Sequence, residues 1–251
     1  MIRKISVLVF LAIAIPAYAE ILVQEDFESL PTGTRLADFG PGWVTTTFAY
    51  KVGSQVGFAA DGSQYLEAPS RAGVGTKTRY GWFDASAAFN SRQSGLNLVV
   101  ETVKMFIPNA TDSTYGGMFM FDQLGHPVAV IGVDMLTHKT LTNASIDVAD
   151  INVLLGQYND IELLANYDSG LVDYFFNGTK IGSTQMSAAS LAAGFSDFDF
   201  YSNGFNATSS LAFRYDDYLV QAVPEPGSLV LLALALGGLA ASRRKSVASS
   251  I

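Results

Sequence analysis

The chain has 251 residues, 49% of them hydrophobic, with no cysteine and only two histidines, His126 and His138. The absence of cysteine excludes disulfides, thiolate nucleophiles and cysteine-ligated zinc, and neither histidine has a second one at a metal-ligand spacing. Without the basic residues near the two ends, 10 basic and 23 acidic side chains remain. The resulting net charge of −13 disfavours a nucleic-acid partner. Such an acidic surface is either simply solvated or binds divalent cations.

The first 19 residues have the parts of a secretion signal. Arg3 and Lys4 form a positive start, residues 5–15 form an apolar stretch, and Ala17-Tyr18-Ala19 is a small-x-small cleavage site. The apolar stretch is shorter than the about 20 residues that span a bilayer, which favours a cleaved signal over a retained anchor. We therefore expect a signal peptide over residues 1–19 and export of the rest of the chain.

Between the two ends, apolar and polar residues alternate with the period of β-strands. Turn-forming pairs separate the strands: Asp61-Gly62, Gly116-Gly117, Asn177-Gly178 and Asn203-Gly204. One short segment, 187–193, favours a helix. The pattern predicts an all-β fold, a two-sheet antiparallel β-sandwich of the jelly-roll type, in one domain over residues 20–221. The expected strands are residues 21–27, 43–50, 80–84, 96–107, 117–121, 128–134, 160–166, 171–176, 197–201 and 211–220.

Residues 158–182 have the pattern of two successive hairpins. An aromatic-led strand turns at Asp168-Ser169-Gly170, and the next strand turns at Asn177-Gly178 before the pair Ile181-Gly182. This pattern resembles the late hairpins of concanavalin A-like and laminin G-like jelly rolls, although Tyr158 stands where those families usually have Trp. The paired segments 117–122 and 128–133 resemble strands of the same families. Over residues 96–182 the resemblance implies the same jelly-roll fold.

Two acidic clusters at opposite ends of the domain suggest a structural calcium site. They are Asp26 with Glu28, and Asp216 with Asp217. On a strand, Asp26 and Glu28 would point to one side and Phe27 to the other. Several carbohydrate-binding jelly rolls resemble this chain in opening with Asp-Phe-Glu and closing with Asp-Asp on neighbouring strands, and that resemblance implies bound calcium, which takes six to eight oxygen ligands. The alternative is that the clusters are solvated strand ends far apart.

No catalytic constellation matches the polysaccharide-degrading enzymes of this fold. Glycosidases need two carboxylates that flank the sugar bond. The nearest arrangement, Asp197-x-Asp199, lacks the third acid of the Glu-x-Asp-x-Glu strand found in bacterial glucanases, and we interpret it as the polar face of a half-buried strand. We expect no enzymatic activity. Aromatic residues in loops or on a sheet face are candidates for stacking on sugar rings, although each is also a normal core residue: Trp43, Tyr50, Tyr80, Trp82 and Tyr115.

The last segment, 222–251, has three parts in a fixed order. Val223-Pro224-Glu225-Pro226 precedes an apolar segment, 229–241, and the basic cluster Arg243-Arg244-Lys245 follows. The apolar segment is just long enough for a short transmembrane helix. This order resembles the PEP-CTERM sorting signal of Gram-negative bacteria, and an ordinary C-terminal anchor is the alternative. The resemblance implies a transient inner-membrane anchor, processing by an exosortase-type protease, and delivery to the cell surface or the exopolysaccharide matrix.

Together these features predict an exported, non-enzymatic protein of the cell surface or matrix that binds carbohydrate. Its expected partners are the processing protease, exopolysaccharide and, transiently, the membrane. Two alternatives remain open: a structural matrix component without a specific ligand, and a polysaccharide-degrading enzyme on the same fold. An aromatic row across an open groove would indicate binding, two carboxylates facing each other in that groove would indicate degradation, and a structural role predicts neither.

Overall fold

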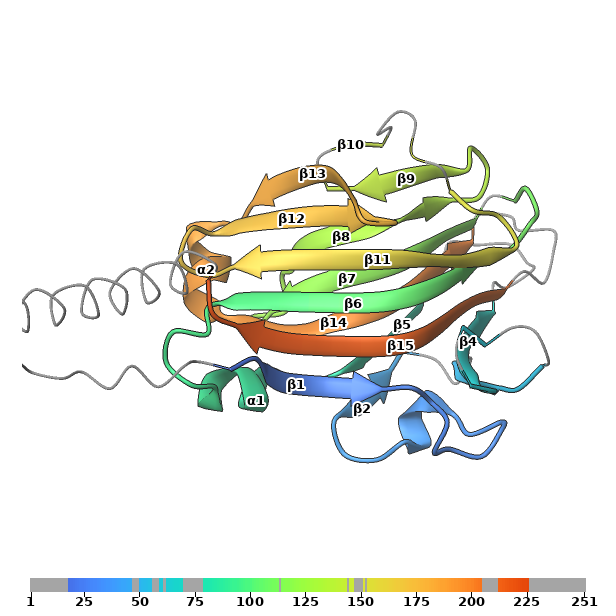
Figure 1. The fold of residues 1–251 in the computed structure, drawn as a ribbon, viewed down its shortest axis with the longest axis horizontal. Helices are drawn as coiled ribbons and strands as arrows, with labels where there is room; N and C mark the ends of the chain where they lie inside the picture. Colours follow the sequence, from blue (N-terminus) through green and yellow to red (C-terminus); the bar gives the residue numbers. More distant parts are fainter. Residues whose placement is uncertain are drawn as a thin grey trace, which may run out of the picture.

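The computed structural model describes residues 18–46, 50–55, 59–60, 62–69, 79–112, 114–143, 145–146, 151, 153–204 and 212–225. These residues form two antiparallel sheets that pack face to face (Figure 1). The predicted all-β sandwich is therefore confirmed. Most of the signal peptide, the apolar segment 229–241 and the basic cluster 243–245 lie outside the described residues. No helix in the described ranges combines the length and apolar character that crossing a membrane requires.

In the part of the chain that the structure describes, the first sheet has eight strands, and β15 lies near its middle. Two strands pair with β15 on the same side. Strand β1 pairs with one part of its length, and β4 pairs with another part. The spatial order is β13 (Thr179–Gln185), β12 (Leu171–Phe176), β11 (Gln157–Asn166), β6 (Leu98–Ile107), β15 (Ala212–Val223), β4 (Tyr65–Pro69) and β3 (Lys51–Gly53), with β1 (Glu20–Glu25) paired to β15.

Among the described residues the second sheet has seven strands, and two short helices lie in connections between the two sheets. Helix α2 (Ala188–Ala193) is the helix expected at 187–193, and Ser187 caps it by accepting a hydrogen bond from the Ser190 amide at 3.0 Å. The other helices are α1 (Ser86–Ser91) and the 3-10 turn η1 (Leu36–Asp38). The strand order is β10 (Ser145–Ile146), β9 (Lys139–Thr142), β8 (Pro127–Asp134), β7 (Thr114–Asp122), β14 (Phe195–Gly204), β5 (Arg79–Phe83) and β2 (Trp43–Thr45).

The first and last strands of the domain lie side by side, as expected. Strand β1 pairs antiparallel with β15, from Glu20 opposite Ala222 to Glu25 opposite Tyr218, and Figure 1 shows the two strands running together. Strand β15 extends to Val223, so the first residue of the sorting motif belongs to the sheet.

The two predicted hairpins around β12 are confirmed. Asn177 and Gly178 have φ angles of 48° and 72°, which are the left-handed values that a tight two-residue hairpin turn requires. The β11–β12 pair runs from Asn166 opposite Leu171 to Ile161 opposite Phe176. Local turn chemistry therefore determines the register of this part of the sheet.

One of the predicted turns, Gly116-Gly117, is wrong, because both glycines lie inside a strand. Gly116 and Gly117 are within β7, and Asn203-Gly204 ends β14 opposite Tyr115 and Thr114. A Cβ on Gly116 would lie 2.5 Å from the Phe213 ring, and one on Gly117 would lie 2.1 Å from the Ile131 carbonyl oxygen. These glycines therefore allow close packing across the sandwich and between neighbouring strands.

Aromatic and aliphatic side chains fill the space between the sheets, and one carboxyl group is buried among them. Glu101 on β6 has no exposed surface, and neither of its carboxyl oxygens has a hydrogen-bond partner among the described residues. Burial raises the pKa of Glu101 well above its usual value, which favours the neutral, protonated form of this side chain.

Candidate functional site

The outer face of the second sheet carries a band of aromatic side chains. On β14, Phe198 and Phe200 are fully buried in the core, so the alternate residues, including Tyr201, face outward. Tyr201 pairs with Tyr80 on β5, and Phe119 packs on the Tyr201 ring at 4.7 Å between centroids. The outer faces of antiparallel sandwiches are normally polar, so a band of aromatic side chains on this face is unusual and calls for an explanation. Its members are Tyr80, Trp82, Tyr115, Phe119, Phe121 and Tyr201.

A cavity of about 340 Å³ opens at one end of this band. Tyr80 and Trp82 from β5 and Phe121 from β7 supply its apolar walls. The β14–β5 register places Asp199 directly opposite Trp82, which brings a carboxyl group beside the rings. The remaining lining residues are Thr46, Asp122, Gln123, Gly125, Ser196 and Asp197.

Asp197 and Asp199 form a buried carboxyl pair in this cavity. They lie two residues apart on β14 and therefore on the same face, with exposed fractions of 8% and 5%. Their side chains hydrogen-bond to each other, and the Ser196 hydroxyl donates to Asp197. One oxygen of Asp199, Oδ1, has no partner in the part of the chain that the structure describes. The predicted half-buried polar face is thus a buried, partly unsatisfied pair.

Burial, the hydrogen bond with Asp197 and the neighbouring negative charges hold the pKa of Asp199 well above its usual range. Burial also raises the pKa of Asp197. Two carboxyl groups this close cannot both ionise easily, so the pair keeps a proton at neutral pH. The pair can therefore both donate and accept a hydrogen bond.

A third acid, Asp122, lines the cavity but is committed to the β7–β8 turn. Its Oδ1 accepts from the amides of Leu124 and His126, each at 2.9 Å, and its Oδ2 lies 3.2 Å from His126 Nδ1. Burial alone would raise the pKa of Asp122, but these hydrogen bonds outweigh burial and lower it. Asp122 is therefore an ionised carboxylate, and both of its oxygens already have partners within the turn.

The structure separates the five predicted sugar-stacking residues into two groups. Tyr80, Trp82 and Tyr115 lie on the aromatic face and keep part of their surface exposed. Tyr50 is fully buried, and its hydroxyl donates to the Phe200 carbonyl at 3.0 Å, so the prediction for Tyr50 is wrong. Trp43 packs against rings of the core, stacking on Phe200 at 6.4 Å.

Sequence reasoning missed Phe119, Phe121 and Tyr201. Their signal was the aromatic alternation on β7 and β14, where Phe119 and Phe121 alternate with buried methionines and Tyr201 continues the face of the two aspartates. Alternation identifies two faces of a strand, but only strand pairing shows which face looks outward.

The four predicted calcium ligands do not gather into one cluster. Within the described residues, no group of three or more Asp, Glu, His or Cys side chains could hold a metal ion. Strand β1 ends at Glu25, and Phe27 has a left-handed φ of 61°, so the expected strand alternation of Asp26 and Glu28 is interrupted. Calcium binding at these acids stays a prediction.

Instead, acids from both clusters hold the segment that precedes β4. The amides of Ser63 and Gln64 donate to Glu28 Oε1 at 2.6 Å each, and these bonds lower the pKa of Glu28. The Ala60 amide donates to Asp216 Oδ2 at 2.8 Å. Asp217, with φ of 49°, lies at a bulge in β15.

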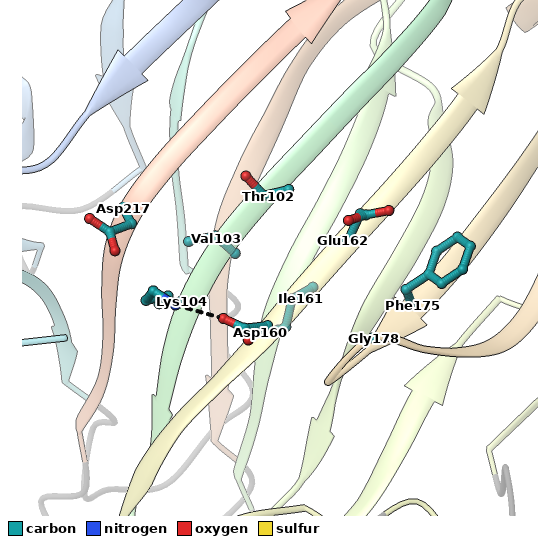
Figure 2. A pocket seen from close by; sticks show the side chains of 9 residues that line it. All are labelled: Thr102, Val103, Lys104, Asp160, Ile161, Glu162, Phe175, Gly178 and Asp217. Atoms are coloured by element: carbon teal, nitrogen blue, oxygen red, sulfur yellow. Dashed lines mark hydrogen bonds and ion pairs between the residues drawn. The ribbon is translucent and has the colours of Figure 1, made fainter. Parts of the chain in front are cut away.

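A second cavity, of about 290 Å³, lies on the outer face of the first sheet (Figure 2). Lys104 on β6 forms an ion pair with Asp160 on β11 at 2.9 Å, while Glu162, Phe175 and Asp217 lie around this pair. Because the cation is already paired and both partners are well exposed, this cavity offers weaker recognition chemistry than the aromatic face.

The start of the sorting motif contacts the folded domain. Val223 pairs with Leu98 at the end of β15, and Glu225 Oε1 accepts a hydrogen bond from Asn166 Nδ2 at 2.6 Å. The motif therefore follows the last strand without a spacer. Pro226 and the basic residues Arg243, Arg244 and Lys245 lie outside the described residues.

Solved structures with the same fold are similar to this chain over most of its length. The CBM2 module of the evolved Dit protein of Lactobacillus casei BL23 phage J-1 matches with a TM-score of 0.54 and 10% identity, over 83% of this chain and 97% of the module. A GH131 beta-glucanase catalytic domain from Podospora anserina matches with a TM-score of 0.54 and 9% identity, over 80% of this chain and 95% of the domain. At these identities the likeness shows the fold alone.

A sialidase also matches, with a TM-score of 0.46 and 7% identity, but this chain spans only 19% of its length, so no argument rests on it. None of the curated proteins is similar in sequence to this chain. The PEP-CTERM protein-sorting motif matches residues 222–245. The chain is thus a jelly-roll β-sandwich followed by a PEP-CTERM sorting motif, which implies export and surface sorting in bacteria.

Proposed function

We propose that this protein binds carbohydrate at the bacterial cell surface or in the exopolysaccharide matrix, through the aromatic face of its second sheet, without cleaving the sugar chain. The proposal includes a Gram-negative host, a transient inner-membrane anchor over residues 229–241 and processing by an exosortase-type protease. A fold alone assigns no function, so the proposal rests on the site.

The observation that carries it is the cavity in which Tyr80 and Trp82 stand beside the carboxyl pair of Asp197 and Asp199. Ligand sites are concave and mainly apolar, with a few polar groups that orient the ligand. Flat rings offer an apolar surface for the faces of sugar rings, and carboxyl groups bond to the hydroxyls at their edges. A purely structural role predicts no cavity that combines exposed rings with carboxyl groups.

The carboxyl geometry favours binding over cleavage. Glycosidase carboxyl groups are about 5–5.5 Å apart in retaining enzymes and about 6.5–9.5 Å apart in inverting ones, with the sugar bond between them. Asp197 and Asp199 bond to each other on one strand, so no sugar bond can lie between them. Asp122 is held by backbone amides of its own turn.

A glycan array probed with the full-length protein in mild detergent tests the proposal. Trp82→Ala and Tyr80→Ala should each weaken binding to the glycans retained by the wild type by about tenfold, about 1.4 kcal/mol. Phe175→Ala is the matched control, since Phe175 is a partly buried ring beside the cavity of the opposite sheet, and it should bind as the wild type does. An array on which no glycan is retained would contradict carbohydrate binding.

The absence of cleavage is tested separately. Incubation with the bound polysaccharides should release no reducing sugar. Release that persists through purification and disappears in Asp197→Ala or Asp199→Ala would show that the protein is an enzyme.

A further inference from the structure

Building on the proposed function, we propose that the cavity of the second sheet selects uncharged sugar chains and rejects acidic polysaccharides, and that Asp197 and Asp199 set this specificity.

The first argument is the charge of the lining. The ten described residues that line the cavity include three carboxyl side chains, Asp122, Asp197 and Asp199, and no lysine, arginine or histidine. Asp122 is ionised, and a pair that shares one proton keeps one negative charge. A uronate, sialate or sulfate group entering the cavity would therefore meet negative charge with no cation to pair with it.

The second argument is the unsatisfied oxygen. Asp199 is 95% buried by its 5% exposed fraction, lines the cavity, and leaves Oδ1 without a partner among the described residues. A buried polar atom without a partner is costly, so a ligand group that donates to it gains affinity. Sugar hydroxyls can donate, whereas the carboxylate or sulfate of an acidic sugar can only accept.

The third argument is the position of the pair relative to the rings. Asp199 lies opposite Trp82 on the paired strand β5, so a sugar stacked on the Trp82 ring presents its edge hydroxyls toward the pair. Rings and carboxyl groups therefore act on the same sugar unit, and the pair determines which substituents on that unit are tolerated.

Affinity electrophoresis of the full-length protein in mild detergent measures this preference. Gels at pH 7 contain either an uncharged polysaccharide (mixed-linkage β-glucan, galactomannan or xyloglucan) or an acidic one (alginate or polygalacturonate). At least one uncharged chain should retard the wild type with an affinity about tenfold or more above that for either acidic chain.

Asn substitutions test the residues themselves. Asp197→Asn with Asp199→Asn keeps the shapes and removes the charge, so the preference over acidic chains should fall several-fold. Glu162→Gln removes one carboxylate on the opposite sheet and should leave the preference unchanged. Melting curves establish whether each variant is folded. If the double variant is not folded, the comparison of uncharged with acidic chains in the wild type decides selectivity on its own.

The outcomes separate the two proposals. Equal or tighter binding to alginate or polygalacturonate overturns the selectivity and leaves carbohydrate binding standing. Retained selectivity in the folded double variant overturns the role of the pair. Binding to none of the five polysaccharides, nor to any glycan of the array, overturns both.

Discussion

At the scale of single residues, the buried carboxyl groups lower the stability of this sandwich. Glu101 lies in the apolar core with both oxygens unpartnered among the described residues. Asp199 is comparably buried but lines the candidate site. An unsatisfied polar group that lines a site can bind a ligand. Glu101 faces the core instead, where no ligand would reach it.

Replacing Glu101 with methionine should therefore stabilise the protein. The apolar side chain of similar size removes two unsatisfied oxygens, and the free energy of unfolding at pH 7 should rise by about 1–3 kcal/mol. The pKa of Glu101 is raised in the folded state, so its contribution to stability is fully present below the unfolded pKa of about 4.3 and is lost as pH rises toward the folded pKa. The gain should thus be smallest near pH 4 and grow with pH.

Denaturant unfolding at several pH values checks this. Glu101→Gln is the matched control, because it removes the titration but keeps an unsatisfied polar group, so it should flatten the pH dependence with a smaller gain. A Glu101→Met variant that is less stable than the wild type at every pH would mean that the carboxyl group has a partner.

At the scale of elements, local turn chemistry could be predicted from the sequence, whereas most pairings between strands distant in sequence could not. The β11–β12–β13 hairpins follow from Asp168-Ser169-Gly170 and Asn177-Gly178, whose turn preferences need no distant partner. Strands β3, β4, β9 and β10 were not predicted, since each is short and carries few residues of strand-like alternation.

The site shows the same limit. Asp197 and Asp199 were recognisable as a pair on one face, and Tyr80 and Trp82 as candidate rings. The aspartates and the rings come together only because β14 pairs with β5, and these strands are more than a hundred residues apart in the sequence. Gly116 was misread for the same reason, because the Phe213 ring that requires it is distant in sequence, whereas the Ile131 carbonyl close to Gly117 belongs to the next strand, β8.

The calcium prediction belongs to this scale, because it concerns how the start of the domain joins its end. If Asp26, Glu28, Asp216 and Asp217 bind calcium, excess calcium should raise the melting temperature by stabilising the folded state alone. Asp217→Ala should abolish that shift, and Glu162→Gln should retain it. Identical melting curves in excess calcium and in chelator would exclude the site.

At the scale of the whole molecule, the sorting motif is placed directly against the folded domain. Val223 is still paired in β15, and Glu225 is bonded to Asn166. A protease that acts at the motif therefore works at the edge of the sandwich.

Processing can be read from the intact mass of the protein isolated from its native host. We expect a species that lacks residues 1–19 and ends near residues 223–226, because both terminal segments have the parts of removable signals. A mature species that still carries residues 229–245 would contradict processing at the motif.

The claim that the aromatic face of the second sheet binds carbohydrate has a direct optical test, because the chain has only two tryptophans. Trp43→Phe leaves Trp82 in the cavity as the single emitter, and Trp82→Phe leaves Trp43, which packs on the core. Titration with a glycan retained on the array should change the emission of the Trp43→Phe protein saturably and leave that of the Trp82→Phe protein unchanged. A bound glycan that leaves Trp82 emission constant while Trp43 emission responds would place the binding site elsewhere and contradict the proposal.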